Sequence, residues 1–530
     1  MKLNYKRTVF VGFAFFLITA FWQAYDTIVP KILTDKFGLA QTISGAIMAL
    51  DNIFALILLP VFGAISDKVS SRFGRRTPFI VIGSICAAVL LVSLSVADSA
   101  QLERLEAVSA TEGEAYTESL GAIWDANPEV GDWRADSLIA DKKPLQEMIS
   151  RNDFTAIPMT VLDANGDTAT NPEYSNIVVP ARQAYAADTT AAHPAPLVIF
   201  MVLLFFTLIA MGTFRSPAVA LMPDVTVKPL RSKANAVINL MGTAGGILVL
   251  LLGTVFGTGK VQNALMSYTT FFAIVAGIML VGLALFLWKV RENAWAADMQ
   301  AESQRLGLDA PEQPVDDGAE MRTLTKGEKL SLFLILASVV FWFMGYNAVT
   351  SKYSVYASTV LNVDYNTTLL IAQAAAIVSY LPVGLLSSKL GRKKMILGGV
   401  IILGASFFFA SFFSAESPQL VKQILMPLLF ATAGIGWATI NVNSYPMVVE
   451  LSRGSNVGKY TGFYYTASMS AQVITPILSG LFLDYISWRT LFPYAAFFVV
   501  LAFITMFFVR HGDAKPAAKE TVLDGIGGAD

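Results

Sequence analysis

The chain has very little of the chemistry that metal sites and redox sites require. Among its 530 residues there is one cysteine, Cys86, and there are two histidines, His193 and His511. A single cysteine excludes an intramolecular disulfide and a cysteine-based metal cluster. Neither histidine lies in an apolar segment or beside a second candidate catalytic group. We therefore expect no metal site, no organic cofactor and no enzymatic activity.

Charge is also scarce. Only 15% of the residues are charged and 55% are hydrophobic, whereas about 25% of the residues of a soluble domain are charged. The net charge of −1 provides no bulk attraction to nucleic acid. The composition therefore predicts an integral membrane protein that contacts lipids and binds no nucleic acid.

Twelve apolar segments are long enough to cross a bilayer, whose core of about 30 Å requires roughly 20 helical residues. They span residues 9–30, 42–65, 77–97, 196–222, 233–257, 267–289, 329–350, 367–388, 394–414, 422–446, 460–485 and 488–510. We predict an all-α polytopic protein with two six-helix halves, the first formed by 1–97 with 196–289 and the second by 329–510. An even number of spans puts both termini on one side.

Basic residues indicate which side that is, because cytoplasmic loops are enriched in lysine and arginine. The expected cytoplasmic groups are Lys2, Lys6, Arg7, Lys68, Arg72, Arg75, Arg76, Lys228, Arg231, Lys233, Lys389, Arg392, Lys393 and Lys394. The opposite short loops contain only Lys31, Lys36, Lys260, Lys352 and Arg489. We expect a plasma (inner) membrane protein with both termini in the cytoplasm, including the tail 511–530.

Two polar stretches interrupt this pattern. Residues 98–195 form an extracytoplasmic insert with 17 acidic and 6 basic residues between Asp98 and Asp188, which is either a small helical cap or a solvated loop. The run from Asp163 to Asp167 resembles a calcium loop only loosely, because its glycine and closing acid are out of place. Residues 290–328 are expected to form a cytoplasmic linker between the halves.

A basic motif with glycines occurs once in each half, as GAISDKVSSRFGRR from residue 63 and GLLSSKLGRKK from residue 384. The two leading glycines would permit close helix approach and the two later ones a tight turn. The basic groups could pair with an aspartate, with helix carbonyls or with lipid phosphates, either as topology anchors or as a gate. The gating candidates are Gly63, Asp67, Arg72, Gly74, Arg75, Arg76, Gly384, Gly391, Arg392 and Lys393.

The first copy resembles the signature of major facilitator transporters. Its enlarged form, SDKVSSRFGRRTPFI, is similar to that of the sucrose-transporter branch of the glycoside–pentoside–hexuronide cation symporters, as are residues 48–67, 214–242 and 434–450. The resemblance implies a twelve-helix transporter that takes up a glycoside such as sucrose or maltose with a cation. The helix-2 aspartates of the melibiose-type sodium symporters correspond here to Ala55 and Leu59, so sodium coupling is less favoured than proton coupling.

Three charges lie within the apolar segments, where charge is costly and usually functional. Burial favours the protonated form of a carboxyl group, so one aspartate exposed alternately to each side could carry a proton. Asp51 is the first candidate and Asp26 the second, with Arg215 as their neutralising partner or a sugar ligand. A static Asp–Arg pair that joins helices is the alternative.

A sugar requires an aromatic surface for its C–H face and amide or carboxyl groups for its hydroxyls. The segments carry suitable side chains, and Trp342 and Tyr346 share a helix face, as do Trp437 and Asn441. Belt or packing roles are the alternative for each aromatic. The substrate-binding candidates are Trp22, Gln23, Asn52, Trp342, Tyr346, Asn347, Gln373, Trp437, Asn441, Asn443, Tyr465 and Gln472.

The leading hypothesis is therefore a proton-coupled importer of a disaccharide or α-glucoside that functions as a monomer. A drug or metabolite exporter with the same fold is the main alternative, although the amides favour a polar, neutral solute. A transporter-like sugar sensor that uses the 98–195 insert is a third possibility.

Overall fold

A computed structural model gives the fold and describes residues 3–131, 142–162, 168–227, 230–305, 325–414, 416–451 and 457–512. Within these residues, eleven helices are long and apolar enough to cross a membrane. A further helix, α13 (Tyr365–Leu390), occupies the remaining expected span. The expected all-α fold is confirmed. The Asp163–Asp167 run and the tail from residue 513 lie outside the described residues.

The first half consists of six long helices that are not all consecutive in the chain. They are α1 (Tyr5–Lys31), α2 (Gln41–Lys68), α3 (Thr77–Arg104), α8 (Ala195–Asp224), α9 (Arg231–Phe256) and α10 (Thr269–Lys289). Helix α1 packs on α9 and α10, and α8 packs on α2 and α3. Their shared core is built from large apolar side chains, among them Phe21, Phe200 and Phe272.

The second half repeats this arrangement with α12 (Lys326–Tyr356), α13, α14 (Arg392–Ala410), α15 (Gln419–Glu450), α16 (Val457–Tyr485) and α17 (Leu491–Phe507). A short 3₁₀ turn, η7 (Trp488–Thr490), precedes α17. Helix α12 packs on α16 and α17, and α15 packs on α13 and α14. The two halves have separate apolar cores, as expected for two bodies that move relative to each other.

The duplication is also visible in the local geometry of the first helix of each half. Helix α1 continues into the π-helical turn η1 (Ile32–Lys36), and α12 continues into the π-helical turn η6 (Ala357–Leu361). The two turns meet, since Lys31 Nζ donates to Ser358 Oγ at 2.8 Å. The first helices of the halves are therefore joined at one face of the molecule.

The described residues of the 98–195 insert form short helices and strands rather than a loop. After α3 come η2 (Glu106–Val108), α4 (Gly113–Ala126), α5 (Leu145–Met148), α6 (Arg151–Thr155), η3 (Tyr174–Val178) and α7 (Val179–Ala192). Strands β1 (Glu129–Gly131) and β2 (Lys142–Pro144) pair antiparallel, as do β3 (Thr160–Leu162) and β4 (Thr168–Thr170). A small apolar core that includes Leu105, Phe154 and Tyr174 holds these elements together.

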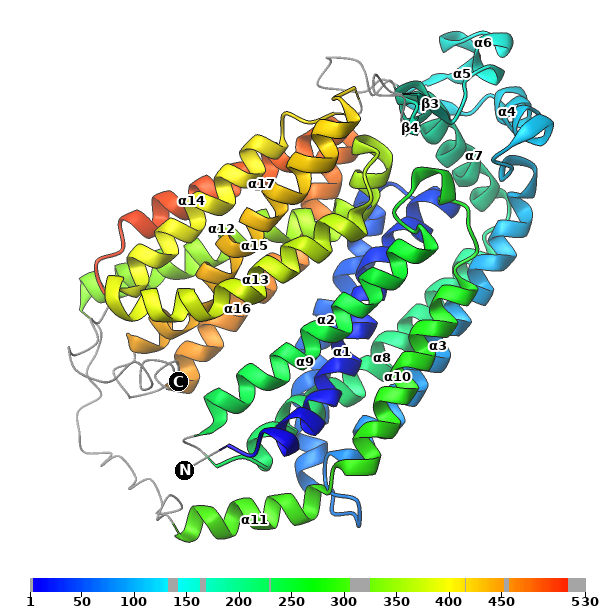
Figure 1. Ribbon diagram of the computed structural model, residues 1–530. Coiled ribbons are helices and arrows are strands. Elements are labelled where there is room, and N and C mark those ends of the chain that lie inside the picture. Colours follow the sequence, from blue (N-terminus) through cyan, green and yellow to red (C-terminus); the bar gives the residue numbers. More distant parts are fainter. Residues whose placement is uncertain are drawn as a thin grey trace.

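The insert lies at one end of the helix bundle, which we call the insert face, and α1 and α12 begin at the opposite end, the terminal face (Figure 1). Helix α11 (Glu292–Arg305), within the expected linker, lies at the terminal face. The halves lean together at the insert face, where α2 packs on α16 and α9 on α13, and they diverge toward the terminal face (Figure 1). The short turn η5 (Val261–Asn263) lies between α9 and α10.

Candidate functional site

The first half brings its three intramembrane charges together from three helices. Asp26 lies on α1, Asp51 on α2 and Arg215 on α8, and each is close enough for its charge to act on the other two. Asn52 Nδ2 donates to Asp51 Oδ1 at 2.7 Å. Arg215 forms no direct ion pair with either aspartate among the described side chains, so this cluster is not a closed salt bridge.

The three charges lie at different depths, Asp26 in the last quarter of α1, Asp51 in the first half of α2 and Arg215 in the second half of α8. Asp26 is exposed, whereas its neighbours Tyr25 and Thr27 are buried, and Asp51 and Arg215 are half-buried. Charged side chains within spanning helices usually face the bundle interior or a water-filled space, so this cluster is a candidate for proton exchange.

Aromatic rings surround the arginine. The guanidinium carbon of Arg215 lies 5.5 Å from the ring centroid of Trp22, a cation–π distance. Trp22 packs edge-on against Tyr25 with ring centroids 5.2 Å apart. The Trp22 Nε1 and the Tyr25 hydroxyl are buried with no hydrogen-bond partner.

The second half contributes neutral groups. Tyr346 on α12 and Trp437 on α15 are stacked, with ring centroids 3.7 Å apart and planes within 2°. Phe343 packs edge-on against Trp437 at 5.2 Å. Asn441, one turn beyond Trp437, is exposed, and the amide nitrogen of Asn347 is buried without a partner. Asn441 is hydrogen-bonded to the Tyr380 hydroxyl. An aromatic surface and amides are the groups that carbohydrate recognition uses.

One hydrogen bond joins the two sides of the site. Gln373 Nε2 on α13 donates to Gln23 Oε1 on α1 at 2.6 Å. The amide assignment follows from this network. Gly246 on α9 lies beside both amides, where a larger side chain would crowd them. This pair links residues of the two halves, and it must break when they separate.

Other candidate residues do not share this space in the present conformation. Trp342 is fully buried in the core of the second half, although it shares a helix face with Tyr346. Asn443 is 2% exposed and donates to Thr439 O of its own helix at 2.9 Å. Gln472 bonds Ser468 O at 3.3 Å. Tyr465 is exposed beside Tyr464, with ring centroids 5.7 Å apart.

The insert face is closed by polar contacts between the halves. Besides the Lys31–Ser358 bond, Thr258 bonds the Tyr365 hydroxyl at 2.8 Å and accepts from Asn366 Nδ2 at 3.0 Å. The insert takes part, since Ser175 Oγ donates to Asn362 Oδ1 at 2.7 Å. The halves are thus joined at the insert face, and they diverge toward the terminal face (Figure 1).

Lysines at the insert face, which are exceptions to the expected charge asymmetry, are neutralised inside the protein. Lys36 is 0% exposed and pairs with Asp98 at 2.5 Å. Lys31 pairs with Asp35 at 3.4 Å. Burial raises the pKa of the Tyr268 hydroxyl, whose ring lies 4.5 Å from Lys36 Nζ. Lys31 and Lys36 therefore stabilise the fold at the insert face and are not free surface charges.

The basic motif of the first half is at the terminal face, and the side chains of Arg75 and Arg76 pair with acids of the same half. Arg76 is 4% exposed, bonds Asp67 and Ser66, and pairs with Asp224 Oδ2 at 2.8 Å. Arg75 reaches Asp224 Oδ1 at 2.6 Å. Burial would lower the pKa of Arg76, but the two aspartates raise it above its ordinary value.

Glu292, a residue that sequence reasoning missed, caps helix α3. Its carboxylate accepts from the backbone N–H groups of Arg75, Arg76 and Thr77, each at 2.8 Å, and from Thr77 Oγ1 at 2.7 Å. The cap ties the start of α11 to the motif, which turns at Gly74 with φ of +117°. A single acid in a polar linker has no periodicity that could have revealed it.

The second copy of the motif binds backbone carbonyls. Arg392 Nη1 donates to Pro446 O at 3.3 Å, and Lys393 Nζ donates to Phe507 O at 2.8 Å and Val509 O at 2.5 Å. Gly391 has φ of +88°. A Cβ atom on Gly63 would contact Ser216, but one on Gly384 would have no neighbour within 4 Å among the described residues, so the expected close approach is not seen there. Arg72 is exposed and lies over the Phe73 ring at 4.6 Å.

Glu292→Gln is expected to lower the free energy of unfolding by about 1–3 kcal/mol, because an amide leaves buried donors unpaired. Thermal unfolding of the detergent-purified protein measures this. Glu302→Gln is the matched control, since Glu302 is 39% exposed in its pair with Arg305. Equal unfolding midpoints for the two variants would contradict the capping role.

Comparison with known proteins agrees with this fold. The chain is similar to solved structures of the inward-open xylose transporter XylE of E. coli (TM-score 0.56, 16% identity, 97% of this chain and 98% of that chain) and of a variant of the nucleoside transporter NupG (TM-score 0.55, 12% identity, 95% and 100%). At these identities the likeness concerns the fold alone.

Curated relatives match only short stretches. The chloramphenicol resistance protein CraA of Acinetobacter baumannii is 28% identical over 123 residues, which is 23% of this chain and 28% of the relative. An uncharacterized symporter of Synechocystis is 38% identical over 53 residues, 10% of each chain. The chain thus aligns with well under a third of the length of either relative.

Family models extend over most of the chain. The model described as MFS/sugar transport protein matches residues 10–100. The model of the Major Facilitator Superfamily matches residues 184–379 and 365–524, which together exceed half of the chain. The matches, the two six-helix halves and the repeated basic motif place this chain in the Major Facilitator Superfamily of membrane transporters.

Proposed function

We propose that this protein takes up a disaccharide or α-glucoside together with protons, by alternating access, as in the sucrose-transporter-like branch of the glycoside–pentoside–hexuronide:cation symporters. The proposal rests on one observation, which is that the two halves contribute different chemical groups to the central site. The first half supplies two neighbouring aspartates with one arginine, and the second supplies an aromatic stack with neutral amides.

In this proposal the carboxylates carry the proton. A protonated carboxyl group is neutral and can move through a low-dielectric conformation, whereas the ionised form favours exposure to water. Asp51 has Asn52 as a hydrogen-bond partner and the charge of Arg215 nearby. Arg215 would favour release of the proton once the site opens to the terminal face.

The sugar would lie between the two halves. Its C–H face would contact Trp437, and its hydroxyls would meet the amides of Asn441, Asn347 and Gln23. A hydroxyl that bonds both Gln23 and Gln373 would replace the hydrogen bond that joins these amides at 2.6 Å. Substrate binding would thereby be coupled to approach of the halves.

We propose that the terminal face is cytoplasmic and that the protein acts as a monomer in the plasma membrane. The basic motifs of both halves lie at this face, and the acidic insert lies at the other. The conformation described above is then open to the cytoplasm.

Uptake by purified protein in liposomes tests the proposal. A panel of sucrose, maltose and monosaccharides is offered under an imposed proton gradient, sodium gradient or no gradient. We expect disaccharide accumulation that requires the proton gradient and is unaffected by sodium. Accumulation of monosaccharides only, or dependence on sodium, would contradict the proposed substrate or coupling ion.

Export of a drug is the second candidate, and the match to a chloramphenicol resistance protein favours it. The same liposomes distinguish the two. Proton-driven exchange of chloramphenicol without any sugar transport would support an exporter, whereas the exposed charges and amides of the site favour a polar solute.

A further inference from the structure

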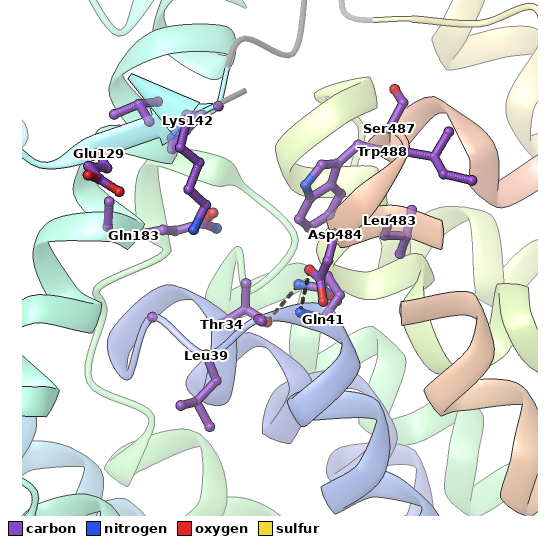
Figure 2. A pocket seen from close by; sticks show the side chains of 17 residues that line it. Thr34, Leu39, Gln41, Glu129, Lys142, Gln183, Leu483, Asp484, Ser487 and Trp488 are labelled. Atoms are coloured by element: carbon purple, nitrogen blue, oxygen red, sulfur yellow. Dashed lines mark hydrogen bonds between the residues drawn. The ribbon is translucent and has the colours of Figure 1, made fainter. Parts of the chain in front are cut away.

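Helix α2 begins without a cap of its own. The first N–H groups of a helix have no intrahelical partner, and Ala40 at the N-cap position has no side-chain acceptor. Asp484, near the end of α16 in the other half, fills this role. Its carboxylate accepts from Gln41 N at 2.8 Å (Figure 2). It also accepts from Thr42 N at 2.6 Å and Thr42 Oγ1 at 2.6 Å.

A lysine of the second half holds the same turn from its other side. Lys352 Nζ donates to Gln41 O at 2.5 Å and is close enough for its charge to act on Asp484. Lys352 is 1% exposed. Both backbone groups of Gln41 are therefore bonded by charged side chains that belong to the opposite half.

Two glycines allow the helices to approach closely enough for these bonds. A Cβ atom on Gly45 of α2 would collide with the carbonyl of Pro476, and one on Gly480 of α16 would collide with the backbone of Gln41 and Thr42. The helix backbones are thus in direct contact beside the carboxylate. Bonds to a charged group are stronger than neutral ones, and the positive end of the α2 dipole favours an anion at this position.

Opening of the insert face must separate α2 from α16. It would remove the carboxylate from the start of α2 and leave the first N–H groups of that helix without protein partners. The contact therefore belongs to the conformation closed at the insert face, and it stabilises that conformation relative to the open one.

We infer that Asp484 is a conformational latch: its carboxylate caps α2 across the two halves and sets how readily the insert face opens. The inference rests on the alternating access proposed above. It does not depend on which solute is carried, since the Asp484 carboxylate bonds the start of α2 rather than residues of the central site.

Distances between spin labels test this inference in the full-length protein without substrate. In a Cys86→Ser background, Lys260→Cys with Glu416→Cys reports on the insert face, and Lys6→Cys with Lys329→Cys reports on the terminal face. All four residues are exposed, one of each pair in each half. Double electron–electron resonance then measures both distributions in the wild-type background and in Asp484→Asn.

We expect Asp484→Asn to raise the ratio of molecules open at the insert face to molecules closed there by about tenfold, the effect of losing one bond to a charged group. The insert-face distance lengthens and the terminal-face distance shortens. Asp153→Asn is the control, because Asp153 is exposed in the insert and accepts a bond from Ser150 Oγ at 2.6 Å within its own helix turn.

Unchanged distributions in Asp484→Asn would overturn the inference, and so would equal shifts in Asp484→Asn and Asp153→Asn. If Asp484→Asn does not fold, Thr42→Ala is measured instead. It removes the bond from Thr42 Oγ1, one of the three that Asp484 accepts. Thr42→Ala is expected to lengthen the insert-face distance and shorten the terminal-face distance, as Asp484→Asn does. If Asp484→Asn shifts the distances but the protein transports none of the sugars, the proposed substrate is wrong and the inference about Asp484 still holds.

Discussion

Replacing Asp51 with asparagine is expected to abolish accumulation driven by a pH gradient while sparing part of the substrate exchange. Asparagine keeps the shape and hydrogen-bonding partners of the side chain but cannot take up a proton. A gradient of one pH unit stores about 1.4 kcal/mol per proton, which supports about tenfold accumulation. The variant should equilibrate the substrate at best, so that the inside and outside concentrations become equal.

Counterflow and pH-driven uptake in the same liposome preparation measure the two activities separately. Asp26→Asn is the matched variant, because Asp26 is exposed in the same cluster on a different helix. If Asp51→Asn still concentrates the substrate and Asp26→Asn does not, the proton carrier is Asp26. If both variants concentrate it, neither aspartate carries the proton and the cluster has a structural role.

Truncating Trp437 to alanine is expected to weaken sugar binding by about 30-fold or more, as loss of about 2 kcal/mol from an aromatic anchor implies. Trp437 is half-buried, and one of its faces is covered by Tyr346 at 3.7 Å. The alanine variant removes the proposed contact surface and the support for Tyr346. Equilibrium binding of the transported sugar, measured by calorimetry or tryptophan fluorescence, gives the change in affinity.

Two variants separate recognition from packing. Trp437→Phe retains an aromatic face and should recover most of the affinity. Trp342→Phe alters a tryptophan that is 0% exposed, so it should lower stability and leave affinity nearly unchanged. A larger loss of affinity in Trp342→Phe than in Trp437→Ala would show that the sugar is recognised in a conformation that exposes Trp342.

The pair Trp342 and Tyr346 shows where sequence periodicity stops being informative. Residues four apart share a helix face, which correctly places both side chains toward the interior of the second half. Periodicity does not say which of them reaches the space between the halves. The stack on Trp437 decides this, and Trp437 comes from a helix far away in the chain.

The two acids that cap helices show the same limit of sequence analysis more strongly. Asp484 and Glu292 lie at a helix end and in a polar linker, where an acid usually lies at the surface. Each caps a helix that is remote in sequence, with separations of 443 and 217 residues from Gln41 and Arg75. Only the packing of α16 against α2, and of α11 against the first basic motif, gives these carboxylates their roles.

The sequence by itself determined the class of protein, the number and approximate limits of its spans, and its division into two repeated halves. Each of these follows from local physics, because every backbone polar group in a bilayer must be paired within its own helix, so that a span is a continuous apolar segment. The charges within the spans could be recognised for the same reason. Tertiary structure alone decided which of them meet, that the insert is folded, and that the insert face is closed, because these depend on contacts between residues hundreds of positions apart.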